Sequence, residues 1–523
     1  MEFFYRMKKT YPLFLGIIIA SFVQPLKAQL EYKDVAPIFY SRCTSCHHDG
    51  QQAFSFMTYS QVLPMTGAIQ NALQTEIMPP WSPDTTYTRF AHERIITQAE
   101  KDAILNWIDS GAVKGDTTLA PAPPVYSQYQ LYGTPTLTLQ IPTYTSTATS
   151  NDIYVCFSLP SGLTEDRVLR AFEIVPGNPE IVHHVVVTAD TTGNTTNDLS
   201  GACFNPPGDF GIGGYAPGAP PTVYPGQAPL KTGITIKASS KIVLQMHYPA
   251  GSAGQVDSTK IRMYFYPPNE PGIRPIYNTT PLQNWGLLIL ANTVATFSDE
   301  YPNSGTLSTP ISIFSTFPHS HQICKSIVNY AYSGTDTIPL IRINQWNFNW
   351  QGFYTFSNLV KIPSGYKLFS EHVYDNTSNN PFNPNNPPAT VIAGTSTSDE
   401  MLFDGYMWLY YQPGDETIDI AALLANDTLL NPAIVGIPEN SSSPALQAFI
   451  YPNPIHDKVN IYLSKSSLYK ATISTISGQH MLQTERFTDN ITIDLKNIPG
   501  GVYFIEIKDI ANNRTIVKKI VRE

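Results

Sequence analysis

Three residues near the N-terminal end of the chain, Cys43, Cys46 and His47, form a CxxCH sequence. In this spacing two thiols can form thioethers with the vinyl groups of haem, and the adjacent imidazole can ligate the iron. The alternatives are a redox-active CxxC with an incidental histidine, or half of a zinc site. They require a thioredoxin-like βαβ pattern or a second pair of ligands, and the sequence shows neither. We therefore expect covalently bound haem c.

Two helices are expected to position this motif. The first leads into the motif and ends near Ser41, with Pro37 in its first turn. The second begins at the capping box Thr97-Gln-Ala-Glu100 and stops near Gly111. Two terminal helices around a haem attachment site resemble a small class I cytochrome c. We assign this small α-helical domain to residues 29–116.

A second axial ligand for the iron is available in three methionines between these helices, Met57, Met65 and Met78. We predict Met78, because Pro79 and Pro80 fix an extended loop that can hold its sulfur against the iron. Met57 and Met65 are expected to fill gaps in the core, where the flexible methionine side chain packs well.

Histidines gather in three groups farther along the chain: His183 with His184, His247, and His319 with His321. Each group lies in an apolar, strand-like run. His319 and His321 are two apart and would project to one face, so both could reach one metal ion. His183 and His184 are adjacent and could share a metal only at a strand end or bulge, or through different ring nitrogens. A lone histidine in an apolar strand is more often a hydrogen-bonded core residue, but the three groups together favour metal binding.

The ligand types and the order of these motifs point to copper. Imidazole suits zinc, copper and iron, whereas a thioether selects copper, and Met401 is the candidate. The order HH, QMHYP, HxH and SDEM, followed by Tyr410-Tyr411, resembles the copper type II, ascorbate-dependent monooxygenases, which include peptidyl-glycine hydroxylating and dopamine-β-type enzymes. Tyr154-Val-Cys156 before the HH pair and the segment 214–225 after it agree. The resemblance covers roughly residues 128–430.

This resemblance implies two successive β-sandwich, jelly-roll-like copper domains, residues 128–280 and 281–430, each carrying one copper ion. The electron-transferring copper would be held by His183, His184 and His247. The copper that binds dioxygen and substrate, and so the catalytic centre, would be held by His319, His321 and Met401.

The chain departs from the peptide-amidating branch of the resembled family at two positions. That branch has an Arg two residues before HxH and a Tyr four residues after the Met, where this chain has Phe317 and Gly405, with Tyr406 one step later. Without the cation, the carboxylate of a peptide substrate would bind poorly. We do not expect peptide amidation.

The three remaining cysteines are Cys156, Cys203 and Cys324, and one pair with one free thiol is the simplest count. We pair Cys156 with Cys203, which closes a loop of about 47 residues, worth roughly 4 kcal/mol in the chain-entropy model. The pair also matches a disulfide of the resembled family. Cys324 is then expected to be a buried free thiol.

Both ends of the chain carry sequence patterns that predict export. Residues 1–28 show a basic start, an apolar run of about 13 residues and a small residue at Ala28, which predict a cleaved signal peptide and not a membrane span, for which ~20 residues are needed. Residues 449–523, with YPNP, an SGQ turn, PGGVYF and a basic final strand, resemble the type IX secretion sorting domain. We expect export through the periplasm to a secreted or cell-surface location, with the type IX secretion machinery as a partner.

The amino-acid composition limits the class of partner and the class of fold. A net charge of −9 argues against a nucleic-acid partner, and only 14% charged residues with abundant Pro, Thr and Tyr predict a multidomain, mainly β protein. Pro-rich linkers are expected at 117–127 and 431–448, the second leading into a small C-terminal β-sandwich.

These expectations combine into one leading function and one alternative. The leading function is an exported monooxygenase that hydroxylates a C–H bond of a small-molecule or peptide substrate with dioxygen. Electrons would come through the fused haem, or from ascorbate or another redox protein. The alternative is a non-catalytic surface electron-transfer or copper-binding protein, which would lack an open position beside an apolar cleft at the Met401 copper.

Overall fold

The computed structural model describes residues 29–431 except 52 and 128, and residues 448–522 with short gaps. The gaps are residues 452–454, 464–466, 476–477, 489 and 512–513. The predicted signal peptide, 1–28, and almost all of the predicted linker 431–448 lie outside the described residues. The chain divides into two compact units, Met1–Val435 and Gly436–Glu523.

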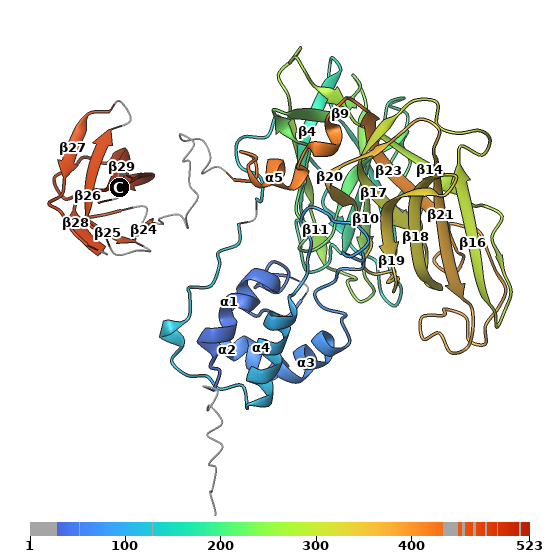
Figure 1. Ribbon diagram of the computed structural model, residues 1–523, viewed down its shortest axis with the longest axis horizontal. Helices are drawn as coiled ribbons and strands as arrows, with labels where there is room; N and C mark the ends of the chain where they lie inside the picture. Colours follow the sequence, from blue (N-terminus) through green and yellow to red (C-terminus); the bar gives the residue numbers. More distant parts are fainter. Residues whose placement is uncertain are drawn as a thin grey trace, which may run out of the picture. The chain divides into compact units, whose positions relative to one another are not determined.

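The first unit begins with a group of helices (Figure 1). Phe39 and Trp107 are buried in their shared core. They are α1 (Tyr32–Arg42), α2 (Tyr59–Val62), η1 (Leu63–Met65), α3 (Thr66–Gln74), α4 (Gln98–Asp109) and η2 (Thr117–Leu119). The predicted capping box at Thr97 is present and opens α4. The prediction for Pro37 was wrong: a capping box formed by Glu31 and Asp34 starts α1 early, so Pro37 falls beyond its first turn.

A first β-sandwich follows, with a seven-stranded and a four-stranded sheet packed on one core. The larger sheet has the order β1-β12-β4-β9-β13, with β7 beside β4 and β8 beside β9, and the smaller has the order β3-β10-β5-β6. The strands are β1 (Leu137–Gln140), β3 (Ile153–Pro160), β4 (Arg167–Val175), β5 (His184–Asp190), β6 (Phe210–Tyr215), β7 (Thr222–Val223), β8 (Gly226–Gln227), β9 (Leu230–Ile236), β10 (Lys241–Tyr248), β12 (Lys260–Phe265) and β13 (Arg274–Pro275), with a separate pair β2 (Tyr144–Thr145) and β11 (Val256–Asp257).

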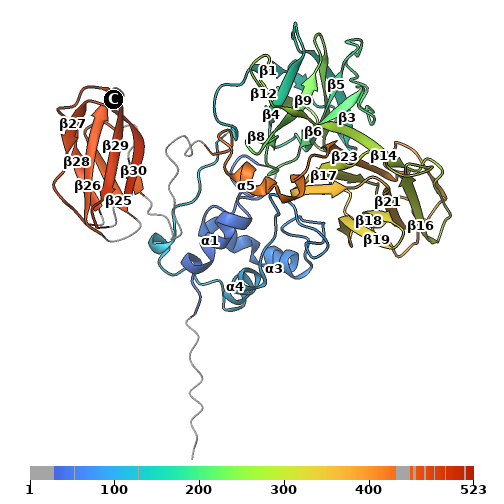
Figure 2. The ribbon, with the colours of Figure 1, turned by 45° about the horizontal axis from the view of Figure 1, so that its top comes forward.

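A second β-sandwich follows the first (Figure 2). Its two four-stranded sheets are ordered β14-β23-β17-β20 and β16-β21-β18-β19. The strands are β14 (Tyr277–Gln283), β16 (Val294–Tyr301), β17 (Ile311–His319), β18 (Cys324–Ser333), β19 (Asp336–Ile343), β20 (Tyr354–Ile362), β21 (Lys367–Asp375) and β23 (Phe403–Tyr410), with a separate pair β15 (Leu288–Ile289) and β22 (Val391–Ile392). The turn η3 (Asp415–Thr417) and the helix α5 (Ile420–Ala425) close the unit against β20.

The parts of the first unit are joined by apolar contacts. Phe314 and Met407 of the second sandwich are buried in the same cluster as the core of the first, so the two sandwiches share a packed boundary. The segment 81–93, between α3 and α4, lies along β20: Phe90 packs on Phe356 at 5.1 Å between ring centroids, and Ala91 N–H donates to the Thr355 carbonyl. The helical part is therefore fastened to the second sandwich.

The second unit is a small β-sandwich with a core that includes Ile461, Ile473 and Ile505. Its sheets are ordered β24-β25-β28 and β27-β26-β29-β30. The strands are β24 (Ala448–Tyr451), β25 (Lys458–Leu463), β26 (Tyr469–Thr475), β27 (His480–Gln483), β28 (Asn490–Asp494), β29 (Gly501–Asp509) and β30 (Arg514–Arg522). Strands thus dominate both units, which confirms the mainly β prediction. Among the described helices, none combines the length and apolar character needed to cross a membrane.

Candidate metal centres

The first candidate centre is formed by His183, His184 and His247, whose ring nitrogens converge. The Nδ1 atom of His184 lies 3.3 Å from Nδ1 of His183 and 3.0 Å from Nδ1 of His247. Nitrogens that bind one first-row metal at about 2 Å are about 3 Å from each other, so this spacing fits a shared ion. The adjacent pair can converge because β5 begins at His184, which leaves His183 outside the strand. The strand-end alternative is the one the fold adopts.

The elements around His247 fix the orientation of its ring. Its Nε2 atom is 2.9 Å from Oδ2 of Asp152, and the Tyr154 ring stacks on it at 4.4 Å. An imidazole whose second nitrogen donates to a carboxylate keeps the first nitrogen free for metal. The hydrogen bond from His247 is the largest of the effects that lower the pKa of Asp152 to about 2, so this carboxyl is ionised at neutral pH.

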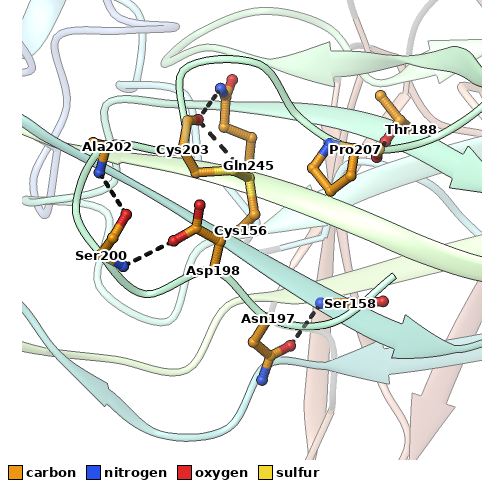
Figure 3. Close-up of a disulfide and its surroundings, with 10 residues drawn as sticks. All are labelled: Cys156, Ser158, Thr188, Asn197, Asp198, Ser200, Ala202, Cys203, Pro207 and Gln245. Carbon is orange, nitrogen blue, oxygen red and sulfur yellow. Dashed lines mark hydrogen bonds between the residues drawn. A yellow bond between two sulfur atoms is a disulfide. The ribbon is translucent and has the colours of Figure 1, made fainter. Parts of the chain in front are cut away.

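The predicted disulfide between Cys156 and Cys203 is present (Figure 3). It ties the segment 198–203 to β3, where Cys203 N–H donates to the Tyr154 carbonyl and Gln245 Nε2 donates to the Cys203 carbonyl. The bridge therefore supports the strand that carries Tyr154 against His247. Cys324 is a buried free cysteine, as predicted.

The second candidate centre contains His319 and His321, whose ring centroids are 5.2 Å apart. The Nδ1 atom of His319 is hydrogen-bonded to the side-chain oxygen of Gln351, and Nδ1 of His321 donates to the Asp399 carbonyl at 3.0 Å. Both acceptors select the tautomer that presents Nε2 to a metal. Burial, reinforced by the neighbouring His321, lowers the pKa of His319 to about 3, so this imidazole is neutral at ordinary pH.

Met401 is brought next to this histidine pair by a buried carboxyl group. Glu400 accepts hydrogen bonds from the backbone N–H of His321 and Met401, and Ser320 Oγ donates to the Met401 carbonyl at 2.6 Å. The segment before β23 is therefore fastened to the end of β17. All three residues predicted for the second copper come from these two joined segments.

The second centre is near enough to the first for His319 to interact electrostatically with His184. Burial, followed by His247 and His183, lowers the pKa of His184 well below its usual value, and His319 of the second centre adds to that shift. Phe317 stacks on Phe353 at 4.5 Å beside His319, where the resembled amidating enzymes have an Arg. The wall at this position is therefore apolar. Tyr406 is buried and accepts a hydrogen bond from Asn329, so it does not replace the family tyrosine.

The CxxCH residues lie where α1 ends. Both thiols are free of disulfide bonding. His47 Nδ1 donates to the Phe54 carbonyl at 2.8 Å, and its ring stacks on Phe56. Burial lowers the pKa of His47, which keeps its Nε2 atom available as a neutral ligand. These residues fit covalent haem attachment. Met78 follows α3, and its assignment as the second iron ligand stays a prediction.

Some residues that support the centres carry no recognisable sequence signal. Asp152 and Gln351 are distant in sequence from the histidines they hold, and Asp399 contributes only a backbone carbonyl. His372, the one histidine of this region outside the three groups, forms a fully buried pair with Asp404 at 3.0 Å between the sheets of the second sandwich.

Copper loading of the first centre should persist on acidification to about pH 5 and fall near pH 4. Burial is the main cause that lowers the pKa of His183 to about 4, and the nearby His247 adds to the effect. The neutral, metal-binding form of His183 therefore persists far below the usual histidine pKa of about 6.5. Copper titrations of the metal-free protein between neutral pH and pH ~4 measure this. A tenfold loss of affinity already at about pH 6 would contradict the expectation.

Two protein families match parts of the chain. Copper type II ascorbate-dependent monooxygenase, C-terminal domain, matches residues 294–421, and Secretion system C-terminal sorting domain matches residues 449–523. Neither match includes the first histidine centre or the CxxCH motif. No curated protein matches the chain.

Solved structures give only weak similarity. PorZ, a surface component of the type IX secretion system of Porphyromonas gingivalis, is 20% identical with a TM-score of 0.14, over 14% of this chain and only 11% of PorZ. A BSP domain of a biofilm associated protein is 9% identical with a TM-score of 0.14, over 76% of this chain and 83% of its own. TM-scores this low carry no argument. The family matches are informative. Residues 294–421 match the C-terminal domain of copper type II ascorbate-dependent monooxygenases. Residues 449–523 match a secretion system C-terminal sorting domain, which marks the protein for export to the cell surface or the medium.

Proposed function

We propose that the protein is an exported copper monooxygenase that hydroxylates a C–H bond of its substrate with dioxygen. The observation that carries this proposal is a three-histidine cluster in one sandwich and the joined His319, His321 and Met401 segments in the next, where the two sandwiches share a packed core. A three-imidazole site suits one-electron transfer, and a thioether ligand favours Cu(I) at a site that keeps a position open. His183, His184 and His247 would hold the first copper, and His319, His321 and Met401 the second.

Bound copper would supply one-electron redox chemistry and a place for dioxygen. The reaction consumes one C–H bond, one dioxygen, two electrons and two protons, and yields an alcohol and water. The chain's own groups hold the ligands: Asp152 orients His247, Gln351 orients His319, and the Asp399 carbonyl orients His321. Phe317 and Phe353 form an apolar wall that offers no cation for a substrate carboxylate.

A haem c bound at Cys43, Cys46 and His47 would supply a one-electron carrier beside the copper domains, as an alternative to ascorbate. The motif contacts the first sandwich directly. Cys46 Sγ lies 3.7 Å from the Pro217 carbonyl, in the loop that follows β6. At Gly218 a Cβ atom would stand 1.9 Å from Cys46 Sγ, so only glycine permits this approach.

This contact is reinforced by the end of the predicted linker 117–127. The Tyr126 ring stacks on His48 at 4.2 Å, and its hydroxyl is 2.7 Å from Thr44 Oγ1. The strand β6 that leads into the contacting loop pairs with β5, which begins at His184. These contacts support electron delivery from the CxxCH region to the first copper centre.

Asp152→Asn is expected to weaken copper binding at the first centre by about ten- to hundredfold and to leave the second centre unchanged. Asp152 accepts from His247 with one oxygen and from Ala250 N–H with the other, and asparagine has only one acceptor oxygen. Copper titration monitored by electron paramagnetic resonance gives the affinity of each centre. Asp166→Asn is the matched control, because Asp166 forms an exposed ion pair with Lys237. Equal affinity in both variants would show that Asp152 does not support the ligand.

The proposed function is tested by copper analysis combined with oxygen uptake. The purified full chain should bind two copper ions and, with ascorbate, consume oxygen in the presence of members of a panel of neutral C–H substrates. Binding of a single copper, or two coppers with no substrate-dependent oxygen uptake, would favour a surface electron-transfer or copper-binding protein instead.

A further inference from the structure

A pocket of about 330 Å³ lies next to the second histidine centre, in the size range of small-ligand sites. Its walls come from the residue after His321, from the loop between β19 and β20, and from the loop after β21. The lining residues are Gln322, Trp346, Asn347, Phe348, Asn349, Pro381, Phe382, Asn383 and Pro384.

The β19–β20 loop connects this pocket to the candidate copper ligands. Trp346 Nε1 donates to the His321 carbonyl at 3.0 Å, and the Phe348 ring lies edge-on to the His321 ring at 5.8 Å. Gln351, in the same loop, accepts from His319 and donates from its Nε2 to the Phe348 carbonyl at 2.8 Å. A ligand that orders this loop would therefore change the surroundings of both imidazoles.

The lining carries rings, prolines and amides and no ionisable side chain. Asn347 and Asn383 use their amides to hold the two loops, through Asn349 N–H and Asn376. By contrast, the side-chain amides of Gln322 and Asn349 make no hydrogen bond to another residue within the described part of the chain. Phe382 is 63% exposed, which is unusual for so large an apolar ring.

This lining selects against two classes of ligand. An ion would lose water without gaining a counter-charge, and a wholly apolar ligand would leave the amides of Gln322 and Asn349 without partners. A neutral sugar matches both parts of the lining, because its hydroxyls donate to and accept from amides while its C–H faces pack on rings. A peptide would call for a free strand edge or a cation for its carboxylate, and the lining provides neither.

We propose that this pocket binds a neutral glycan and that the glycan is the substrate. The second half of this statement rests on the proposed monooxygenase function. In the reaction a sugar C–H bond becomes C–OH, and the second oxygen atom of dioxygen leaves as water. The two electrons come from ascorbate or the haem-bearing part of the chain, and the two protons come from solvent.

Binding is tested with the copper-loaded full chain and three neutral oligosaccharides, cellohexaose, xylohexaose and mannohexaose, by calorimetry. At least one should bind and should also change the Cu(II) resonance spectrum of the second centre, with the same midpoint. Phe382→Ala and Asn349→Ala should each weaken binding by about tenfold. Both side chains are at the surface, so the fold should survive. The control is Phe504→Ala, whose ring is 40% exposed in the sorting domain.

Several outcomes would overturn the inference. They are the failure of all three oligosaccharides to bind, equal binding by the Phe382 and Phe504 variants, and tighter binding of charged oligogalacturonate or of a neutral hexapeptide. Failure of the proposed function is distinguishable, because glycan binding would then persist in the wild type without any glycan-dependent oxygen uptake.

Discussion

Met401→Ala is expected to reduce substrate-dependent oxygen uptake by about a hundredfold or more, while the first centre keeps its copper. Met401 is the one ligand proposed for the second copper that is not an imidazole, and its thioether is the group that favours Cu(I). The substitution should not unfold the protein, because the contacts that fix this segment use the Met401 backbone: its carbonyl accepts from Ser320 and Tyr374. Oxygen uptake and copper resonance spectra of the purified variant measure both parts of the expectation.

Two further variants make this result specific. Met481→Ala removes a partly buried methionine from the sorting domain and should leave uptake unchanged. His247→Ala should lower the copper content of the first centre, because it removes a proposed ligand there. The second centre should keep its copper. Full oxygenase activity in Met401→Ala would refute the assignment of the second centre.

The double substitution of Cys43 and Cys46 by Ala is expected to remove all covalently bound haem. The wild-type protein should retain haem through denaturing electrophoresis, because thioether bonds survive unfolding, and the variant should show none. The copper centres should still load, because neither cysteine lies among the residues that hold them. Haem-specific staining of gels and copper analysis of the same samples measure the two outcomes.

A wild-type protein that loses its haem on denaturation would contradict the c-type assignment. Loss of copper from the double variant would show that the CxxCH region is required for the fold of the sandwiches. The latter result would be informative, since Cys46 packs against Pro217 and Gly218.

The residues with strong local signals were predictable from the sequence. The capping box at Thr97, the Cys156 to Cys203 bridge and the mainly β composition depend on spacing, counting, propensity or resemblance, and all are present in the structure. The order of the histidine motifs indicated the family, and the C-terminal domain match agrees with it.

The remaining features depend on contacts between distant parts of the chain. Whether His183 could join His184 depended on where β5 begins, and periodicity does not fix a strand end to one residue. Asp152 reaches His247 across 95 positions, and Gln351 reaches His319 across 32, so neither pairing leaves a local pattern. Pro37 was misplaced because the glutamate cap at Glu31 starts α1 early enough that Pro37 lies beyond the first turn.

The most direct test of the monooxygenase account is to follow isotopically labelled dioxygen into the product. The copper-loaded full chain, reduced by ascorbate, is incubated with the substrate of the panel that gives the highest oxygen uptake, and the product is analysed by mass spectrometry. We expect one labelled oxygen atom in each product molecule and the other in water. Oxygen uptake that ends in hydrogen peroxide, with an unlabelled and unchanged substrate, would contradict it.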